Sequence, residues 1–137
     1  MELVCPAGNL PSLKAAIDNG ADSVYIGFKD DTNARHFAGL NFDEKKIQQG
    51  IQYAHDKNRK VFLALNTYPQ PSGWSRWKTA VDHAGEINID SLIIADLGVM
   101  DYARNRWPDL NLHLSVQGSA TSYEAVNFYQ RHFDIKR

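Results

Sequence analysis

The sequence of 137 residues contains only one cysteine, Cys5. A single thiol excludes an internal disulfide bond, and it cannot supply the cysteine set that holds an iron–sulfur cluster or a structural zinc ion. The five histidines show no pair at the spacing of a helical metal site. The residues present therefore predict no metal centre within this chain.

Long apolar stretches are also missing. The longest one, Ser91 to Met100, contains Asp96 and is far shorter than the roughly 20 apolar residues that span a membrane. The first residues lead directly into an apolar strand-like run, without the basic and apolar regions of a signal peptide. These absences favour a cytoplasmic protein without a membrane span.

The sequence also lacks an excess of positive or of negative charge. Fifteen Lys and Arg residues stand against sixteen Asp and Glu, which gives a net charge of −1, and the basic residues are spread along the chain. Binding of nucleic acid or of an anionic membrane surface usually leaves a basic patch or stripe. The distribution therefore predicts that nucleic acid is not a partner.

What the sequence does contain is a regular alternation of strand-like and helix-like segments. Asn9 and Asp43 suit the N-caps of two helices, Gly20 suits a left-handed C-cap, and Thr121 with Glu124 suits a capping box for the last helix. The predicted strands are Leu3–Cys5, Ser23–Gly27, Val61–Leu65, Ser91–Ala95 and Asn111–Gln117. Five strands alternating with five helices predict a parallel α/β sheet, either doubly wound or part of a (β/α)8 barrel.

The fifth predicted strand favours the barrel. Apolar Leu112, Leu114 and Val116 alternate there with His113, Ser115 and Gln117, so one face is polar. A barrel builds its site from inner-face residues near the carboxyl ends of its strands, whereas a doubly wound sheet is more often apolar on both faces. We therefore expect residues 1–137 to form a single, incomplete domain, the N-terminal five-eighths of a TIM-type barrel.

A connection at residues 28–42 is the first candidate for a binding site, because connections of this length are often functional. It contains Asn33, Arg35 and His36, and a guanidinium pairs bidentately with a carboxylate. These residues are candidates for holding an anionic or aromatic substrate. The alternative is that Arg35 pairs with Asp30 or Asp31 and only orders the loop.

Polar residues at the ends of later strands are the second candidate set. Asn66 and Asp96 follow the third and fourth strands, and Ser115 and Gln117 belong to the polar face of the fifth. All four are expected at the carboxyl mouth of the barrel. Asn66 and Asp96 could instead cap the following helix or turn, and Ser115 and Gln117 could form a buried polar layer. His113 reads as a core histidine, and no motif identifies a catalytic residue.

With these motifs placed, the sequence resembles the N-terminal portion of the collagenase-like family of peptidases of unassigned type. Within that family it is most similar to the UbiU-like branch of ubiquinone biosynthesis. The resemblance extends over the whole chain and is strongest in the long loop. It rests on the segments Glu2–Asn9, Gly20–Gly27, Asp30–Phe42 and Ser115–Thr121.

The resemblance implies oxygen-independent hydroxylation of the ubiquinone ring precursor, together with a UbiV-like sister protein. Full-length relatives are expected to carry a [4Fe–4S] cluster, and others in the family hydroxylate RNA bases. The cluster cysteines of the family lie in a later half, so this chain is expected to hold no cluster and to be inactive alone. A collagenase-like peptidase and a non-enzymatic partial-barrel assembly module remain as alternatives.

Overall fold

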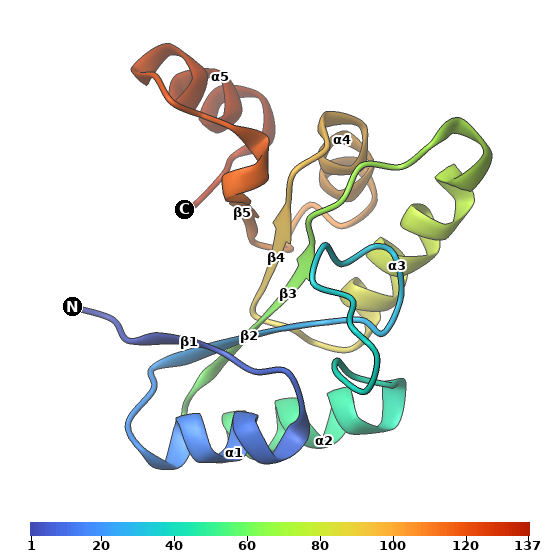
Figure 1. The fold of residues 1–137 in the computed structure, drawn as a ribbon. Helices are drawn as coiled ribbons and strands as arrows, with labels where there is room; N and C mark the ends of the chain where they lie inside the picture. Colours follow the sequence, from blue (N-terminus) through green and yellow to red (C-terminus); the bar gives the residue numbers. More distant parts are fainter.

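The computed structural model describes residues 1–137 and contains one sheet of five parallel strands. The strands lie side by side in chain order, each paired with the one before it (Figure 1). They are β1 (Val4–Pro6), β2 (Ser23–Gly27), β3 (Lys60–Leu65), β4 (Ser91–Ile94) and β5 (Leu112–Leu114). Chain-order parallel pairing is the arrangement of a barrel wall, and the predicted fold class is confirmed.

Five α-helices alternate with the strands, and two short 3-10 helices are added to them. The helices are α1 (Leu10–Asp18), α2 (Glu44–His55), η1 (Pro71–Gly73), α3 (Trp74–Glu86), α4 (Leu97–Arg106), η2 (Val116–Gly118) and α5 (Tyr123–Phe133). Each α-helix follows a strand, as right-handed crossovers between parallel strands require. No helix of the structure has the length and apolar character needed to cross a membrane.

The two faces of the sheet carry different side chains. Residues such as Val24, Leu63 and Ile94 point toward the helices, where they form one buried cluster with the apolar helix faces. Residues that alternate with them lie on the opposite, inner face: Tyr25, Phe62, Ala64, Ile93 and His113. Alternation along a strand thus separates the core from the face that is free to bind a ligand.

Local cap chemistry was predicted correctly at three positions. The side chain of Asn9 accepts a hydrogen bond from the Ser12 amide at 2.8 Å and forms a reciprocal capping box with it. Asp43 accepts from the Lys46 amide at 2.9 Å. Gly20 has a φ of +99°, the left-handed conformation that glycine adopts without strain.

Two predictions near the C-terminus are wrong. The fifth strand ends at Leu114 rather than Gln117, because Ser115 caps the 3-10 turn that follows and accepts from the Gln117 amide. The last helix is capped by Ser122, whose hydroxyl accepts from the Ala125 amide at 3.2 Å, and not by Thr121. Adjacent Thr and Ser offer the same capping chemistry, so residue type alone does not choose between them.

The last two residues lie along the free edge of β5. The Lys136 amide donates to the Leu112 carbonyl at 2.9 Å, and the Leu114 amide donates to the Arg137 carbonyl at 2.8 Å. The Arg137 guanidinium also pairs with the Glu2 carboxylate, which precedes β1. An ion pair therefore links the two open sides of the sheet.

Candidate functional site

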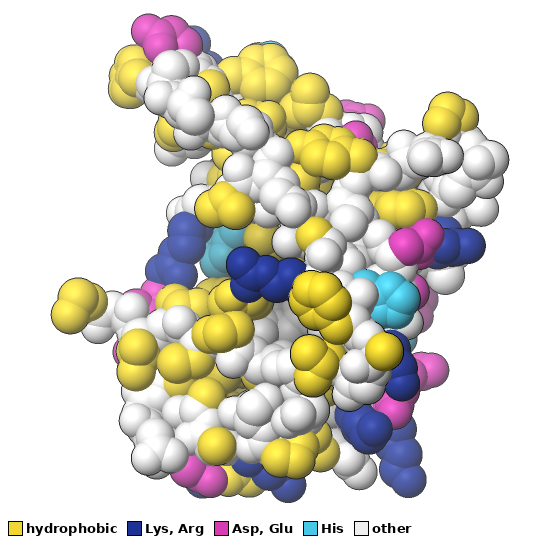
Figure 2. Space-filling model, in the orientation of Figure 1, with side chains coloured by type: hydrophobic (Ala, Val, Ile, Leu, Met, Phe, Trp, Pro, Cys, Tyr) yellow, Lys and Arg dark blue, Asp and Glu magenta, His cyan; other side chains and the backbone are white.

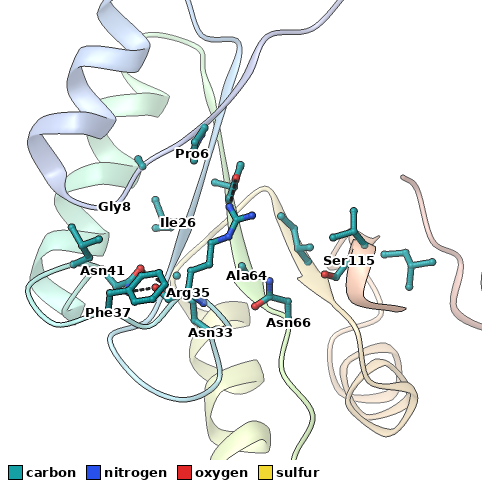
Figure 3. Close-up of a pocket in the computed structure, with 17 residues that line it drawn as sticks. Pro6, Gly8, Ile26, Asn33, Arg35, Phe37, Asn41, Ala64, Asn66 and Ser115 are labelled. Atoms are coloured by element: carbon teal, nitrogen blue, oxygen red, sulfur yellow. Dashed lines mark hydrogen bonds between the residues drawn. The ribbon is translucent and has the colours of Figure 1, made fainter. Parts of the chain in front are cut away.

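A pocket of about 450 Å³ opens at the carboxyl ends of the strands (Figure 3). Its lining comes from the ends of the strands, from η2 and from the 28–42 loop. A volume of roughly 300–1,000 Å³ is usual for small-molecule sites, and barrel enzymes bind their substrates at this end. The pocket thus lies where the polar residues at the strand ends were expected to meet.

The C-terminal end of the 28–42 loop is held against the ends of β1 and β2 by backbone hydrogen bonds. The Phe42 amide donates to the Gly27 carbonyl at 3.2 Å, and the Asn41 amide donates to the Gly8 carbonyl at 2.7 Å. Near its middle, the Ala34 amide donates to Oδ1 of Asn66 at 2.9 Å. These contacts make one wall of the pocket from a segment without regular secondary structure.

Two asparagines fix the backbone on both sides of Arg35. Asn33 is only 6% exposed, and its Oδ1 accepts from the Arg35 amide at 3.1 Å. Its Nδ2 donates to Oδ1 of Asn41 at 3.1 Å, and Nδ2 of Asn41 donates to the Arg35 carbonyl at 3.0 Å. The amide hydrogen bonds of Asn33 and Asn41 are thereby used within the loop, so these side chains position Arg35.

Space for Asn33 exists because residue 27 is glycine. A Cβ atom built on Gly27 would lie 2.0 Å from Nδ2 of Asn33, which no real pair of atoms tolerates. Gly27 ends β2 and lines the pocket. The absence of a side chain at this strand end is therefore what lets the loop approach the sheet.

Arg35 points into the pocket and has no acidic partner. Its Nη1 donates to the phenol oxygen of Tyr25 at 3.1 Å. Asp30 instead accepts from Thr32, and Asp31 pairs with Arg76. The alternative that Arg35 orders the loop through Asp30 or Asp31 is therefore wrong.

Arg35 is also the only charged residue in the pocket lining. Two further hydrogen-bond donors face the same space (Figure 3). Oδ1 of Asn66 is used by the Ala34 amide, so its Nδ2 group remains free to donate. Ser115 is 5% exposed, and its hydroxyl proton has no acceptor within the chain. A pocket with one cation, free donors and no carboxylate suits a ligand rich in acceptor oxygens.

Three residues of the predicted site do not line the pocket. His36 lies next to Arg35 in the loop and is exposed to solvent. Asp96 accepts from the Val99 amide at 2.9 Å and caps α4, which was the stated alternative. Gln117 is exposed in η2, because the chain leaves the strand direction after Leu114. Asn33, Arg35, Asn66 and Ser115 do come together.

Sequence reasoning missed Tyr25, Phe37 and Asn41, all of which line the pocket. Tyr25 could have been found from alternation, since it lies between the outward-facing Val24 and Ile26 on β2. The loop residues carry no comparable signal, because a segment without periodicity does not reveal which of its side chains face inward.

His113 lies below the pocket on the inner face of the sheet. It is buried and packs edge-to-face against Phe62, with ring centroids 4.8 Å apart. Burial lowers the pKa of the His113 imidazole, and the nearby Arg137 guanidinium lowers it further. His113 is therefore a buried packing residue of the inner face, and it does not line the pocket.

The chain does not supply the ligands of an iron–sulfur cluster. Such a cluster takes four cysteine thiolates, and Cys5 is the only cysteine here. No group of three His, Cys, Asp or Glu side chains lies close enough to hold a metal ion. A cluster in longer relatives therefore remains a prediction about residues outside this chain.

Comparison with known proteins identifies the family. The model of peptidase family U32 matches residues 8–137. The chain belongs to this family. It is 39% identical to an uncharacterized protease of Methanocaldococcus jannaschii over 131 residues, covering 96% of this chain and 31% of that protein. It is 37% identical to tRNA hydroxylation protein P of Helicobacter pylori over 130 residues, covering 94% of this chain and 31% of that protein.

A solved U32 peptidase has the same fold. Its TM-score is 0.76 at 12% sequence identity, over 96% of this chain and 55% of that structure. This likeness supports the partial barrel architecture alone. Because the chain spans about a third of the length of the U32 relatives it matches (31% of both proteins above), their activities come to it only as proposals.

The expectation that nucleic acid is not a partner is wrong for this family, since one of its members is named for tRNA hydroxylation. The charge argument looked for a clustered basic patch, and it could cover only the part of the relatives that this chain spans, 31% of the Helicobacter pylori protein. Basic residues in the remainder of such a protein lie outside its reach.

Proposed function

We propose that this chain forms the substrate-binding part of a hydroxylation protein that acts on an RNA base. The observation that carries the proposal is the guanidinium of Arg35, which faces a pocket without any Asp or Glu. The similarity to a tRNA hydroxylation protein supplies the type of reaction. In this proposal Arg35 holds an oxyanion of a small reactant, while Asn66 and Ser115 donate to its remaining oxygens.

The arrangement gives these residues a binding and orienting role. Arg35 is anchored through its backbone by Asn33 and Asn41 and through Nη1 by Tyr25, so its remaining N–H groups have a defined direction. Because the guanidinium is already oriented before a reactant binds, less conformational entropy is lost on binding. The rest of the lining is largely apolar, including Phe37 and Ile93, so the polar contacts of a reactant would be concentrated at these few donors.

A second candidate is oxygen-independent hydroxylation of the ubiquinone ring precursor. The mixture of apolar lining and one cation also suits an aromatic carboxylate, which is the observation in its favour. Peptide hydrolysis has less support. The lining contains no His, Asp, Glu or Cys, the side chains that would most readily act as a general base for attack on a peptide, and the phenol oxygen of Tyr25 accepts from Arg35.

One experiment separates these candidates. The gene for the full protein is deleted, and the strain is complemented with the intact protein, Arg35→Ala or Arg131→Ala. Arg131 is an exposed arginine on α5 and serves as the control. Nucleosides from tRNA and rRNA and the cellular quinones are then quantified by mass spectrometry.

We expect deletion and Arg35→Ala to remove a hydroxylated nucleoside, and Arg131→Ala to restore it. Loss of hydroxylated quinone with unchanged nucleosides would favour the ubiquinone candidate. Unchanged nucleosides and unchanged quinones in the deletion strain would contradict both.

A further inference from the structure

An exposed apolar rim surrounds the opening of the pocket. Phe37 is 59% exposed and lies in the 28–42 loop, and Val116 is 93% exposed at the start of η2. Both line the pocket, and Leu40 lies beside Phe37 in the same loop. Figure 3 places Phe37 and Ser115 on opposite sides of Arg35, so the rim borders the cavity from two sides.

Phe37 is held outward by a tight turn and has no aromatic partner in the chain. The Leu40 amide donates to the Phe37 carbonyl at 3.1 Å, and Gly39 and Asn41 adopt left-handed φ values of 81° and 74°. Leu40 packs toward Gly8, but the Phe37 ring makes none of the ring contacts found elsewhere in the structure. Contact of such a ring with water is unfavourable in free energy, and a ligand that stacks on the ring would remove that contact.

The charges around the rim suit an anionic polymer. Arg35 is the only charged residue in the lining, and the nearby carboxylate of Asp31 is neutralised by Arg76. Figure 2 shows basic side chains beside apolar ones around the hollow in the middle of this face. An aromatic ring next to a free arginine is the combination on which unpaired bases stack in single-stranded nucleic acid.

We propose that Phe37 is a stacking platform for one unpaired base of single-stranded RNA, which enters the pocket between Phe37 and Val116. The inference rests on the proposed function, because a base must be unstacked from its neighbours before a reactant can reach the atoms of its ring. Phe37 contacts the face of the base, and Arg35 lies deeper, beside the small reactant. Duplex RNA does not fit this arrangement, since its bases are stacked on one another.

The test is a binding titration of the full chain at one fixed salt concentration. The probe is a single-stranded uridine heptamer with 2-aminopurine at its centre, whose fluorescence falls when the base stacks on an aromatic ring. We expect Phe37→Ala to weaken binding about tenfold and to abolish the quenching, as stacking contributions of this size imply. Phe37→Trp should bind at least as tightly as the parent.

The control variant is Tyr123→Ala, which removes an exposed aromatic ring from α5. It should bind like the parent, and circular dichroism should show all variants folded, because Phe37 is too exposed to support the core. Equal binding by Phe37→Ala and the parent would overturn the inference. A parent that prefers a blunt duplex, or that binds a phenylalanine-containing peptide but not the heptamer, would also overturn it.

The outcome is distinguishable from failure of the proposed function. If Arg35→Ala abolishes nucleoside hydroxylation in cells while Phe37→Ala binds the heptamer normally, only the stacking role fails. If the deletion strain keeps all of its hydroxylated nucleosides while Phe37→Ala loses binding, the proposed function fails and the RNA-binding rim remains.

Discussion

Nη1 of Arg35 donates a hydrogen bond of 3.1 Å to the phenol oxygen of Tyr25. The two residues come from different parts of the fold, since Tyr25 projects from the inner face of β2 and Arg35 belongs to the loop that follows it. The contact fixes one nitrogen of the guanidinium and leaves the others directed at the pocket. It ties the direction of the only charge in the lining to the sheet.

Removing this contact should weaken binding of an aromatic carboxylate. With benzoate as the probe, we expect Tyr25→Phe to lower affinity about threefold to tenfold, the value of one lost hydrogen bond. Arg35→Ala should lower it more, about tenfold to a hundredfold, because a charged partner is lost. Isothermal titration calorimetry measures both, with Tyr123→Phe as the control. Undiminished affinity in Arg35→Ala would refute the anion site.

Gly27→Ala should dislodge the loop from the sheet. The new methyl group would lie 2.0 Å from Nδ2 of Asn33, so the asparagine must move and its hydrogen bonds to the loop must break. We expect the free energy of unfolding in urea to fall by about 1–3 kcal/mol, as for other overpacked positions. Gly8→Ala is the control, since its Cβ would lie at an ordinary 3.5 Å from Leu40. Equal stability of the two variants would argue against the close approach.

Asp96→Ala should affect stability and leave the pocket unchanged. Asp96 caps α4 through the Val99 amide and does not line the cavity. Loss of such a cap typically costs about 0.5–2 kcal/mol, which thermal or urea unfolding detects. Asp96→Asn keeps an accepting oxygen and should restore most of the stability. A loss of benzoate affinity in folded Asp96→Ala would place this residue back in the site.

His113 should make the protein less stable in mild acid. Its pKa is lowered in the folded state by burial, then by Arg137 and Lys60, while Glu2 acts in the opposite direction. The unfolded chain therefore takes up a proton first. Stability is fully present above the ordinary histidine pKa of about 6.5 and falls as the pH drops toward the lowered folded value.

Urea unfolding of the parent and of His113→Gln between pH 8 and pH 5 checks this dependence. The variant should show a flatter profile over that window, which lies above the range where Glu2, whose pKa is itself lowered by Arg137, takes up its proton. Parallel profiles for the two proteins would assign the pH dependence to other groups.

The parts of the fold that sequence reasoning predicted correctly depend on local chemistry. Asn9 and Asp43 cap helices by accepting hydrogen bonds from backbone amides three positions later. Gly20 adopts a left-handed φ after the end of α1, which glycine does without strain. The strands Ser23–Gly27 and Lys60–Leu65 are continuous β-rich runs, so only their ends were uncertain. Interactions over such short distances are visible in a single sequence.

The pocket was only partly predictable because its geometry depends on contacts between distant segments. Asn33 and Asn41 are paired across a loop without periodicity, and Ala34 reaches Asn66 at a separation of 32 residues. Gln117 was placed wrongly because alternation alone does not show where a strand stops. Ser115 ends it by capping a turn, which an alternating pattern of residues cannot distinguish from one more inward-facing position.

The order of strands in the sheet, identical to their order along the chain, has a consequence for biosynthesis. When β3 leaves the ribosome, its hydrogen-bonding partner β2 has already been made, and the same holds for β4 and β5. Each new strand can pair at once instead of waiting for a distant one, which shortens the time that an unpaired edge is exposed to aggregation. Chain-order pairing thus allows this wall of the barrel to assemble one strand at a time during translation.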